Sequence, residues 1–272
     1  MGAMKVDDVR NVLIVGAGTM GRAIGLQCAM HGFEVALYDT SEEALAGARR
    51  EQEAILTHLV AEGRLTEAAA AATLERISAT ENAESAAAEA DLLSESVPER
   101  PELKREVLAR FHELCPPRTV FTTNTSTFVP SMFADDCGRP DRFASLHFHH
   151  PVWIANVADV MPHPGTDPEV VELLESFAWR IGQIPIVCRK ENNGYVFNAM
   201  LLSLLGSALT LVASEVAPPE DVAVVRVRTT AEMAAAVLDA LPRTDLLVMA
   251  AAPADYRPAA PSSRKIKKTE TG

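Results

Sequence analysis

The chain has 272 residues, which is long enough for one large or two ordinary domains with a sizeable core. A formal net charge of −12, together with the lack of an apolar run of about 18 residues, argues against nucleic acid and membranes as partners. The four cysteines are widely spaced and form no CxxC or Cys/His ligand pattern, so we expect reduced thiols, no metal site and a cytoplasmic protein.

The first predicted element is a buried strand, residues 11–15, that runs into a glycine turn and then into an apolar helix. This is the context that a GxGxxG motif requires. Gly16 permits the tight turn, Gly18 lets a pyrophosphate approach the backbone, and Gly21 lets the helix pack close to the strand. The helix N-terminus would face the phosphates. The predicted dinucleotide contacts of this segment are Gly16, Gly18, Thr19, Met20 and Gly21.

A second predicted strand, residues 34–38, ends at Asp39, 23 residues after Gly16. A carboxylate at this place can accept hydrogen bonds from both ribose hydroxyls and would repel a 2′-phosphate. We therefore expect NAD rather than NADP as the cofactor. The alternative is a strand–turn–helix unit that uses its glycines only for packing.

Helices and strands continue to alternate along the chain. This alternation predicts an α/β fold with a parallel, doubly wound, Rossmann-type sheet and with ligands at the carboxyl ends of its strands. We expect helices over residues 42–62, 66–76, 81–89, from 101, 167–181 and 194–214, and strands over 91–97, 119–123, 142–146, 156–161 and 184–188. Polar residues that follow strands, and that should meet at one rim, are Gly16, Asp39, Glu95, Glu99, Asn124, Ser126 and His147.

Five motifs in order resemble the NAD-dependent L-3-hydroxyacyl-CoA dehydrogenase family, over residues from about 11 to 222. They are the glycine turn 16–21, Asn124-Thr-Ser126, Leu146-His147-Phe148, Asp159-Val-Met161 and Gly194-Tyr-Val-Phe-Asn198. The resemblance implies a nucleotide-binding domain followed by the first helix of a second domain. It also implies a role in fatty acid metabolism, with a 3-hydroxyacyl-CoA or a similar hydroxy acid as substrate.

The same resemblance assigns roles to single residues. His147 would act as general base on the 3-hydroxyl while a hydride leaves C3 for the nicotinamide of NAD, and Asp159 would orient the imidazole. Ser126 and Asn198 would hold the substrate oxygens. The residues implied to lie along the cofactor are Glu99, Lys104 and Asn124.

The chemistry of these residue types agrees with the assignment. Imidazole accepts a proton near neutral pH, and a carboxylate behind the ring fixes its tautomer and stabilises imidazolium. The 12 positions between His147 and Asp159 permit two adjacent strands to bring them together. Aspartate stands where the family usually has glutamate, and His149-His150 stands where it usually has Phe-Asn. Three imidazoles are thus candidates, and we prefer His147 because it directly follows the predicted strand.

After Val222 the chain departs from this family. Residues 222–227, 230–241 and 245–249 predict a strand, a helix and a strand, followed by Ala-Asp-Tyr-Arg and Lys-Ile-Lys-Lys segments. This tail resembles a fragment of phosphopantothenoylcysteine synthetase, in which Asp255 and Lys265 would match functional positions, although Pro253 stands where valine is usual.

We therefore expect a dinucleotide-binding domain over 1–193, the truncated beginning of a second domain over 194–221, and a synthetase-like tail over 222–272. A homodimer is possible, but the apolar helical domain that closes over the substrate and forms the family's dimer is missing. Two other functions stay open. One is an NAD-binding module without turnover, and the other is a synthetase.

Overall fold

The computed structural model describes residues 4–216, and the elements expected after Val222 lie outside them. The chain divides into two units, 1–200 and 201–272, and the first contains the whole sheet. The helices are α1 (Thr19–Met30), α2 (Glu42–Ala61), α3 (Glu67–Glu75), α4 (Ala83–Ala87), α5 (Pro101–Leu114), α6 (Pro168–Arg180) and α7 (Phe197–Ala213). The strands are β1 (Asn11–Val15), β2 (Glu34–Tyr38), β3 (Ile77–Thr80), β4 (Leu92–Glu95), β5 (Val120–Thr123), β6 (Phe143–Phe148), β7 (Val157–Pro162) and β8 (Ile184–Val187).

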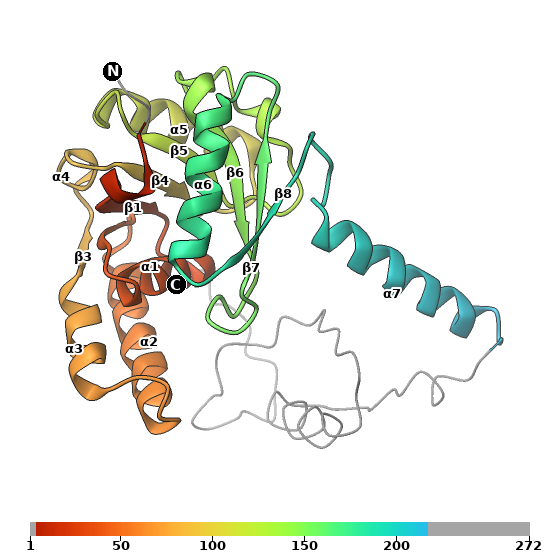
Figure 1. Ribbon diagram of the computed structural model, residues 1–272, viewed down its shortest axis with the longest axis horizontal. Helices are drawn as coiled ribbons and strands as arrows, with labels where there is room; N and C mark the ends of the chain where they lie inside the picture. Colours follow the sequence, from red (N-terminus) through yellow and green to blue (C-terminus); the bar gives the residue numbers. More distant parts are fainter. Residues whose placement is uncertain (1–3, 217–272) are drawn as a thin grey trace, which may run out of the picture. The chain divides into compact units, whose positions relative to one another are not determined.

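The strands form one eight-stranded sheet in the order β3-β2-β1-β4-β5-β6-β7-β8, with helices on both faces (Figure 1). The α/β, doubly wound fold class is confirmed. The expectation of an entirely parallel sheet is wrong at one place, because β6 and β7 are antiparallel. Only residues 149–156 join these two strands, and a parallel crossover needs a dozen residues or more. The antiparallel register sets His147 directly opposite Asp159.

The sequence did not predict β3, which pairs with β2 at the edge of the sheet. Of its four residues only Ile77 is buried, so the strand lacks the apolar pattern that marks a core strand. The helix expected over 81–89 is reduced to α4. A further correction concerns His147, which lies inside β6 rather than after it, because the strand continues to Phe148.

The two faces of the sheet form separate apolar cores. In β1, Val12 and Ile14 point to one core and Leu13 and Val15 point to the other, as expected for alternating side chains in a strand. The first core includes buried residues of α1, α2 and α6, and the second includes those of α4 and α5. Figure 1 shows α6 across one face, with α5 behind the sheet.

Local signals explain where several helices begin. Ser41, Thr66 and Asn82 accept a hydrogen bond from a backbone N–H in the first turn of α2, α3 and α4. Proline occupies the first position of α5 and α6, where its missing N–H costs nothing. Within residues 4–216, no helix is both long and apolar enough to cross a bilayer.

Candidate functional site

The glycine turn between β1 and α1 is closely packed at two of its three glycines. Gly16 has a φ of +107°, and a Cβ placed there would lie 2.7 Å from the carbonyl oxygen of Ser96. A Cβ at Gly21 would lie 1.8 Å from the carbonyl oxygen of Gly16, so only glycine lets α1 begin this close to the turn. By contrast, a Cβ at Gly18 would meet no protein atom within 4 Å. The backbone at Gly18 is therefore open to a ligand.

Asp39 directly follows β2 and lies beside this turn. Its Oδ2 accepts a hydrogen bond from the backbone N–H of Ala17 at 2.8 Å, and its Oδ1 accepts one from the N–H of Ser41 at 3.0 Å. The carboxylate is thus fixed against the glycine turn. A negative charge at this place disfavours a ligand that carries an additional phosphate nearby.

A hollow of about 750 Å³ opens over the turn, the carboxyl ends of β2 and β4, and α5. Its size is that of a cofactor or ligand pocket. The sequence analysis missed Arg100 and Arg110, which line it and bring positive charge toward a phosphate ligand. Arg100 directly precedes α5 and Arg110 lies within it, so these basic residues after β4 were the signal that could have predicted a positively charged lining. The predicted cofactor residues in its lining are Gly16, Gly18, Thr19, Met20 and Asp39.

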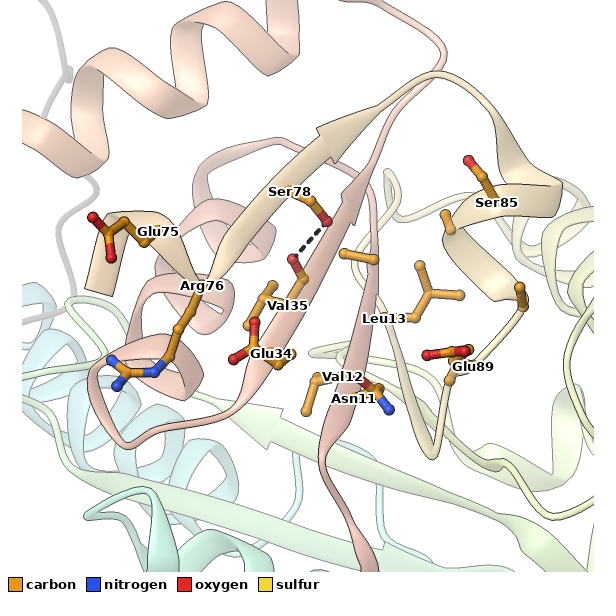
Figure 2. Close-up of a pocket in the computed structure, with 14 residues that line it drawn as sticks. Asn11, Val12, Leu13, Glu34, Val35, Glu75, Arg76, Ser78, Ser85 and Glu89 are labelled. Atoms are coloured by element: carbon orange, nitrogen blue, oxygen red, sulfur yellow. Dashed lines mark hydrogen bonds between the residues drawn. The ribbon is translucent and has the colours of Figure 1, made fainter. Parts of the chain in front are cut away.

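A second hollow, of about 440 Å³, lies over the first residues of β1 and β2 and beside α4 (Figure 2). In it the Ser78 hydroxyl donates a hydrogen bond to the carbonyl oxygen of Val35 at 3.2 Å. Open α/β sheets bind their ligands at the carboxyl ends of the strands, and this hollow lies at the amino ends. The first hollow is therefore the candidate cofactor site.

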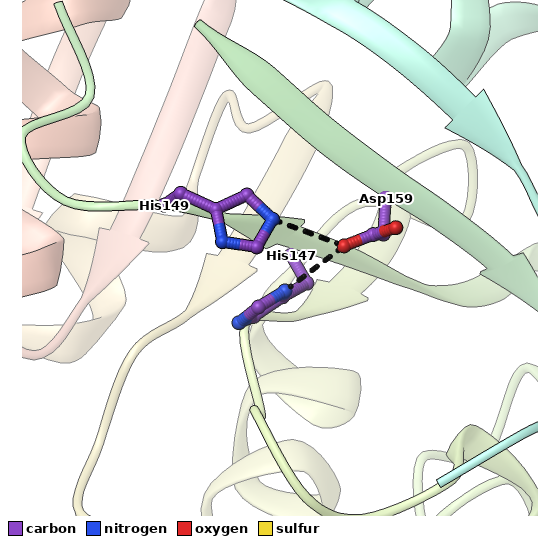
Figure 3. A group of neighbouring side chains, drawn as sticks. All are labelled: His147, His149 and Asp159. Atoms are coloured by element: carbon purple, nitrogen blue, oxygen red, sulfur yellow. Dashed lines mark hydrogen bonds and ion pairs between the residues drawn. The ribbon is translucent and has the colours of Figure 1, made fainter. Parts of the chain in front are cut away.

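His147, His149 and Asp159 form a buried cluster on β6 and β7 and the loop that follows β6 (Figure 3). Nδ1 of His147 lies 3.3 Å from Oδ2 of Asp159, and Nε2 of His149 lies 3.1 Å from the same oxygen. These side-chain types also bind metal ions. Here, however, one nitrogen of each histidine lies at hydrogen-bond distance from the same carboxylate oxygen, Oδ2 of Asp159. The expectation that the chain binds no metal stays a prediction.

The other imidazole nitrogen of His147 faces Ser126, with Nε2 at 3.1 Å from the serine Oγ. If Nδ1–H donates to Asp159, then Nε2 has a free lone pair and accepts a hydrogen bond from the Ser126 hydroxyl. Burial lowers the pKa of His147, although the hydrogen bond and charge of Asp159 oppose this effect. The ring is thus held neutral at physiological pH with its basic nitrogen turned toward Ser126.

Asp159 is fully buried. Burial alone would raise the pKa of its carboxyl group, but the hydrogen bonds from His147 and His149 hold that pKa below its ordinary value. The carboxylate therefore stays charged behind the imidazole. Its second oxygen, Oδ1, has no hydrogen-bond partner among the described residues.

Glu99 holds the loop that carries Ser126. One of its carboxylate oxygens accepts the backbone N–H groups of Ser126 and Thr127, at 3.0 and 3.2 Å, and the hydroxyls of Thr125 and Thr127. Burial raises the pKa of Glu99, but the hydrogen bond from Thr125 and the charge of Lys104 lower it more. Because Glu99 lies between Pro98 and Arg100, which line the larger hollow, it connects that hollow to the Ser126 loop.

Lys104 lies in α5 with its side chain buried. Its Nζ is 2.9 and 3.0 Å from the two carboxylate oxygens of Glu95 and 3.2 Å from Oε2 of Glu99. Removing one partner of a buried ion pair leaves an uncompensated charge, so Lys104 and Glu95 keep each other in place. The structure therefore gives Lys104 a positioning role for Glu99, and its contact with a cofactor stays a prediction.

The two predicted asparagines lie at the ends of other elements. Asn124 follows β5, and its Oδ1 accepts a hydrogen bond from the backbone N–H of Phe148 at 2.8 Å, which fixes the side-chain amide against β6. Asn198 lies in the first turn of α7. Among the described residues, no hydrogen bond joins Asn198 to Ser126 or His147, and its substrate contact stays a prediction.

Tyr195 is a site residue to which the sequence analysis gave no role. Its ring stacks on His147, with 4.7 Å between ring centroids and 9° between planes. Its hydroxyl donates to the carbonyl oxygen of Thr125 at 2.6 Å, and burial raises its pKa, so the phenol stays neutral. Tyr195 thus covers one face of the imidazole and ties it to the Ser126 loop. The signal that could have pointed to Tyr195 was its place beside Gly194, at the start of a predicted helix.

Comparison with known families finds two matches along the chain. Residues 11–192 match the family described as 3-hydroxyacyl-CoA dehydrogenase, NAD binding domain. Residues 192–272 match the family described as DNA/pantothenate metabolism flavoprotein C-terminal domain. Both resemblances noted in the sequence are confirmed. The first match covers the sheet, the glycine turn and the His147 cluster.

Individual relatives agree. The chain is 35% identical over 213 residues to 3-hydroxyadipyl-CoA dehydrogenase from Escherichia coli K12, covering 78% of this chain but only 44% of that protein. It is 31% identical over 220 residues to the mitochondrial hydroxyacyl-coenzyme A dehydrogenase of Rattus norvegicus, covering 79% of this chain and 69% of the relative.

Solved structures show the same likeness. A diketoreductase structure is 39% identical, with a TM-score of 0.75 over 78% of this chain and 76% of the other. An Escherichia coli 3-hydroxybutyryl-CoA dehydrogenase structure is 35% identical, also with a TM-score of 0.75, over 78% of this chain and 44% of the other.

Proposed function

This chain belongs to the 3-hydroxyacyl-CoA dehydrogenase NAD-binding family, whose cofactor is NAD, and from that membership we propose that it is a working dehydrogenase. Its reaction would convert the 3-hydroxyl of a 3-hydroxyacyl-CoA, or of a similar hydroxy acid, to a ketone, with NAD accepting the hydride. The observation that carries the proposal is the chain of contacts from Ser126 through His147 to Asp159. A serine, a neutral imidazole and a buried carboxylate in this order make a general base with its orienting partner.

In this mechanism Nε2 of His147 takes the proton of the substrate hydroxyl. Nδ1–H keeps its hydrogen bond to Asp159, so the imidazolium that forms has a carboxylate behind it. Ser126 then holds the substrate oxygen that Nε2 faces, together with Asn198 once substrate is bound. In the reverse direction the imidazolium returns the proton to the oxygen of the ketone.

The cofactor would lie in the larger hollow. The open backbone at Gly18 and the N-terminus of α1 suit a pyrophosphate, and Asp39 suits the two hydroxyls of an unphosphorylated ribose. Glu99, Lys104 and Asn124 are not among the residues that line this hollow, but Glu99 follows Pro98 of the lining and accepts hydrogen bonds from the Ser126 loop. We propose that these three residues lie toward the nicotinamide end of the cofactor.

A second function is an NAD-binding module without turnover. The chain spans 44% of the length of the Escherichia coli relative, and its last 81 residues match a different family. Residues 1–193 would then bind the dinucleotide, residues 194–221 would begin a truncated second domain, and residues 222–272 would form the tail. On this reading the chain binds the dinucleotide, but no substrate transfers a hydride to it.

NADH formation from L-3-hydroxybutyryl-CoA, followed by absorbance over a range of pH, separates the two functions. The base must be neutral to accept a proton, so we expect kcat/KM to rise with pH as His147 deprotonates. Because burial lowers the pKa of His147, the midpoint should lie below about 6.5, the ordinary value for histidine. A midpoint above that value contradicts the assignment of His147 as the general base. NAD binding without NADH formation favours the NAD-binding module.

A further inference from the structure

Two imidazoles share one oxygen of Asp159. His147 and His149 approach Oδ2 from β6 and from the loop that follows it, at 3.3 and 3.1 Å. The side chain of Asp159 is fully buried, and those of the two histidines are 4% and 11% exposed. Because Oδ1 has no partner within residues 4–216, both hydrogen bonds of this carboxylate come from the two imidazoles.

This geometry links His149 to the behaviour of His147. Each N–H that donates to Oδ2 draws negative charge from the carboxylate, which leaves less charge to stabilise a proton on the other ring. The rings also touch directly, edge to face, with 4.7 Å between centroids and 81° between planes. His149 therefore limits both the tilt of His147 and its affinity for a proton.

Other groups face the same cluster, and none of them donates to Asp159 among the described contacts. Glu99 acts on His147 through its negative charge. Tyr195 stacks on one face of the His147 ring and is neutral. Cys188 faces Asp159 from the end of β8, and burial raises the pKa of its thiol to about 11, so it is neutral as well. Phe197 packs against the His149 ring, at 4.3 Å between centroids.

We propose that His149 is a positioning residue for His147: the Nε2–H of His149 donates a hydrogen bond to Oδ2 of Asp159, the same carboxylate oxygen that orients the base. The proposal rests on the proposed function of His147 as general base. It deepens that function by explaining why a histidine follows the base at this place, between Asp159 and Phe197.

The test compares His149→Phe with His149→Gln in the full-length chain. Phenylalanine keeps the ring and removes the donor, whereas the amide nitrogen of glutamine can reach nearly the place of Nε2 and donate. Two readouts are used on each variant: the pH profile of kcat/KM, and the NMR titration of His147, whose signal is assigned by its loss in His147→Gln. NAD binding by calorimetry and the unfolding temperature complete the comparison.

We expect His149→Phe to raise the titration midpoint of His147 by about 0.5 to 1 pH unit, with the acidic limb of kcat/KM moving by the same amount. His149→Gln should return both midpoints close to the wild-type value. A residue that only fills space would lower the unfolding temperature or kcat without moving either midpoint. If His149→Phe does not fold, His149→Asn, whose amide is too short to reach Asp159, takes its place with the same expectation.

The outcomes separate this proposal from the proposed function. An unchanged NMR midpoint of His147 in a folded variant without the donor overturns the role of His149, whatever the enzyme does. A raised NMR midpoint in a protein that never forms NADH supports the link between the two histidines and rejects the dehydrogenase.

Discussion

Replacing His147 by glutamine is expected to lower kcat/KM for a 3-hydroxyacyl-CoA by about 100- to 10,000-fold, the range usual for loss of a general base. Glutamine can still donate a hydrogen bond toward Asp159 or Ser126, but it cannot take up a proton. The affinity for NAD should change little, because the glycine turn and Asp39 lie apart from the exchanged side chain. Steady-state NADH formation and calorimetry with NAD measure the two quantities.

The matched control is His58→Gln. His58 lies on α2, where its exposed ring lies with Nε2 3.0 Å from a carboxylate oxygen of Glu62. The exchange there should leave kcat/KM within about twofold, since surface substitutions have small effects. If His147→Gln is as active as this control, one of the neighbouring imidazoles, His149 or His150, is the base and the assignment of His147 is wrong.

The second large effect is expected at Gly18. A methyl group there meets no protein atom within 4 Å, and the φ of −67° is one that alanine adopts readily. Gly18→Ala should therefore fold normally. If a pyrophosphate rests against this backbone, the methyl group overlaps it at a cost of about 1–3 kcal/mol, and the Kd for NAD rises by about 5- to 150-fold. Calorimetric titration with NAD measures the change.

Gly47→Ala supplies the same added methyl group at a residue outside the lining of the larger hollow. Gly47 lies inside α2, where a Cβ comes no closer than 3.8 Å to another side chain, so the exchange should stabilise the helix slightly and leave NAD binding unchanged. Equal Kd values for the two variants would show that the dinucleotide does not approach Gly18. Gly21→Ala is no substitute, because its methyl group collides with the turn itself.

The strand, turn and first helix were predictable from the sequence because each had a strong local signal. A strand with four consecutive apolar residues after Asn11, glycines at fixed spacing and a carboxylate at the end of the next strand all agreed. The edge strand β3 had no such signal, since only Ile77 of it is buried. The direction of β7 was missed because alternation of elements does not show strand direction, although the short connection after β6 could have done so.

In the site, spacing anticipated that His147 and Asp159 lie on adjacent strands, and the register now pairs them. Their catalytic roles stay predictions. What could not be predicted depends on tertiary contacts across long sequence separations. Tyr195 stacks on His147 from the segment before α7. Lys104, which we expected along the cofactor, forms an ion pair with the buried carboxylate of Glu95. His149 was noted as a departure from the family pattern, but its bond to Asp159 follows only from the fold.

The most direct test of the central claim, that this chain transfers a hydride with His147 as base, uses L-3-hydroxybutyryl-CoA deuterated at C3. The protein is incubated with this substrate and NAD, and the reduced cofactor is analysed by NMR. We predict deuterium at C4 of the nicotinamide in the wild-type reaction, and formation of the same labelled product about 100- to 10,000-fold more slowly in His147→Gln. Wild-type protein that binds NAD but leaves the deuterium on the substrate would contradict the account and leave a dinucleotide-binding module.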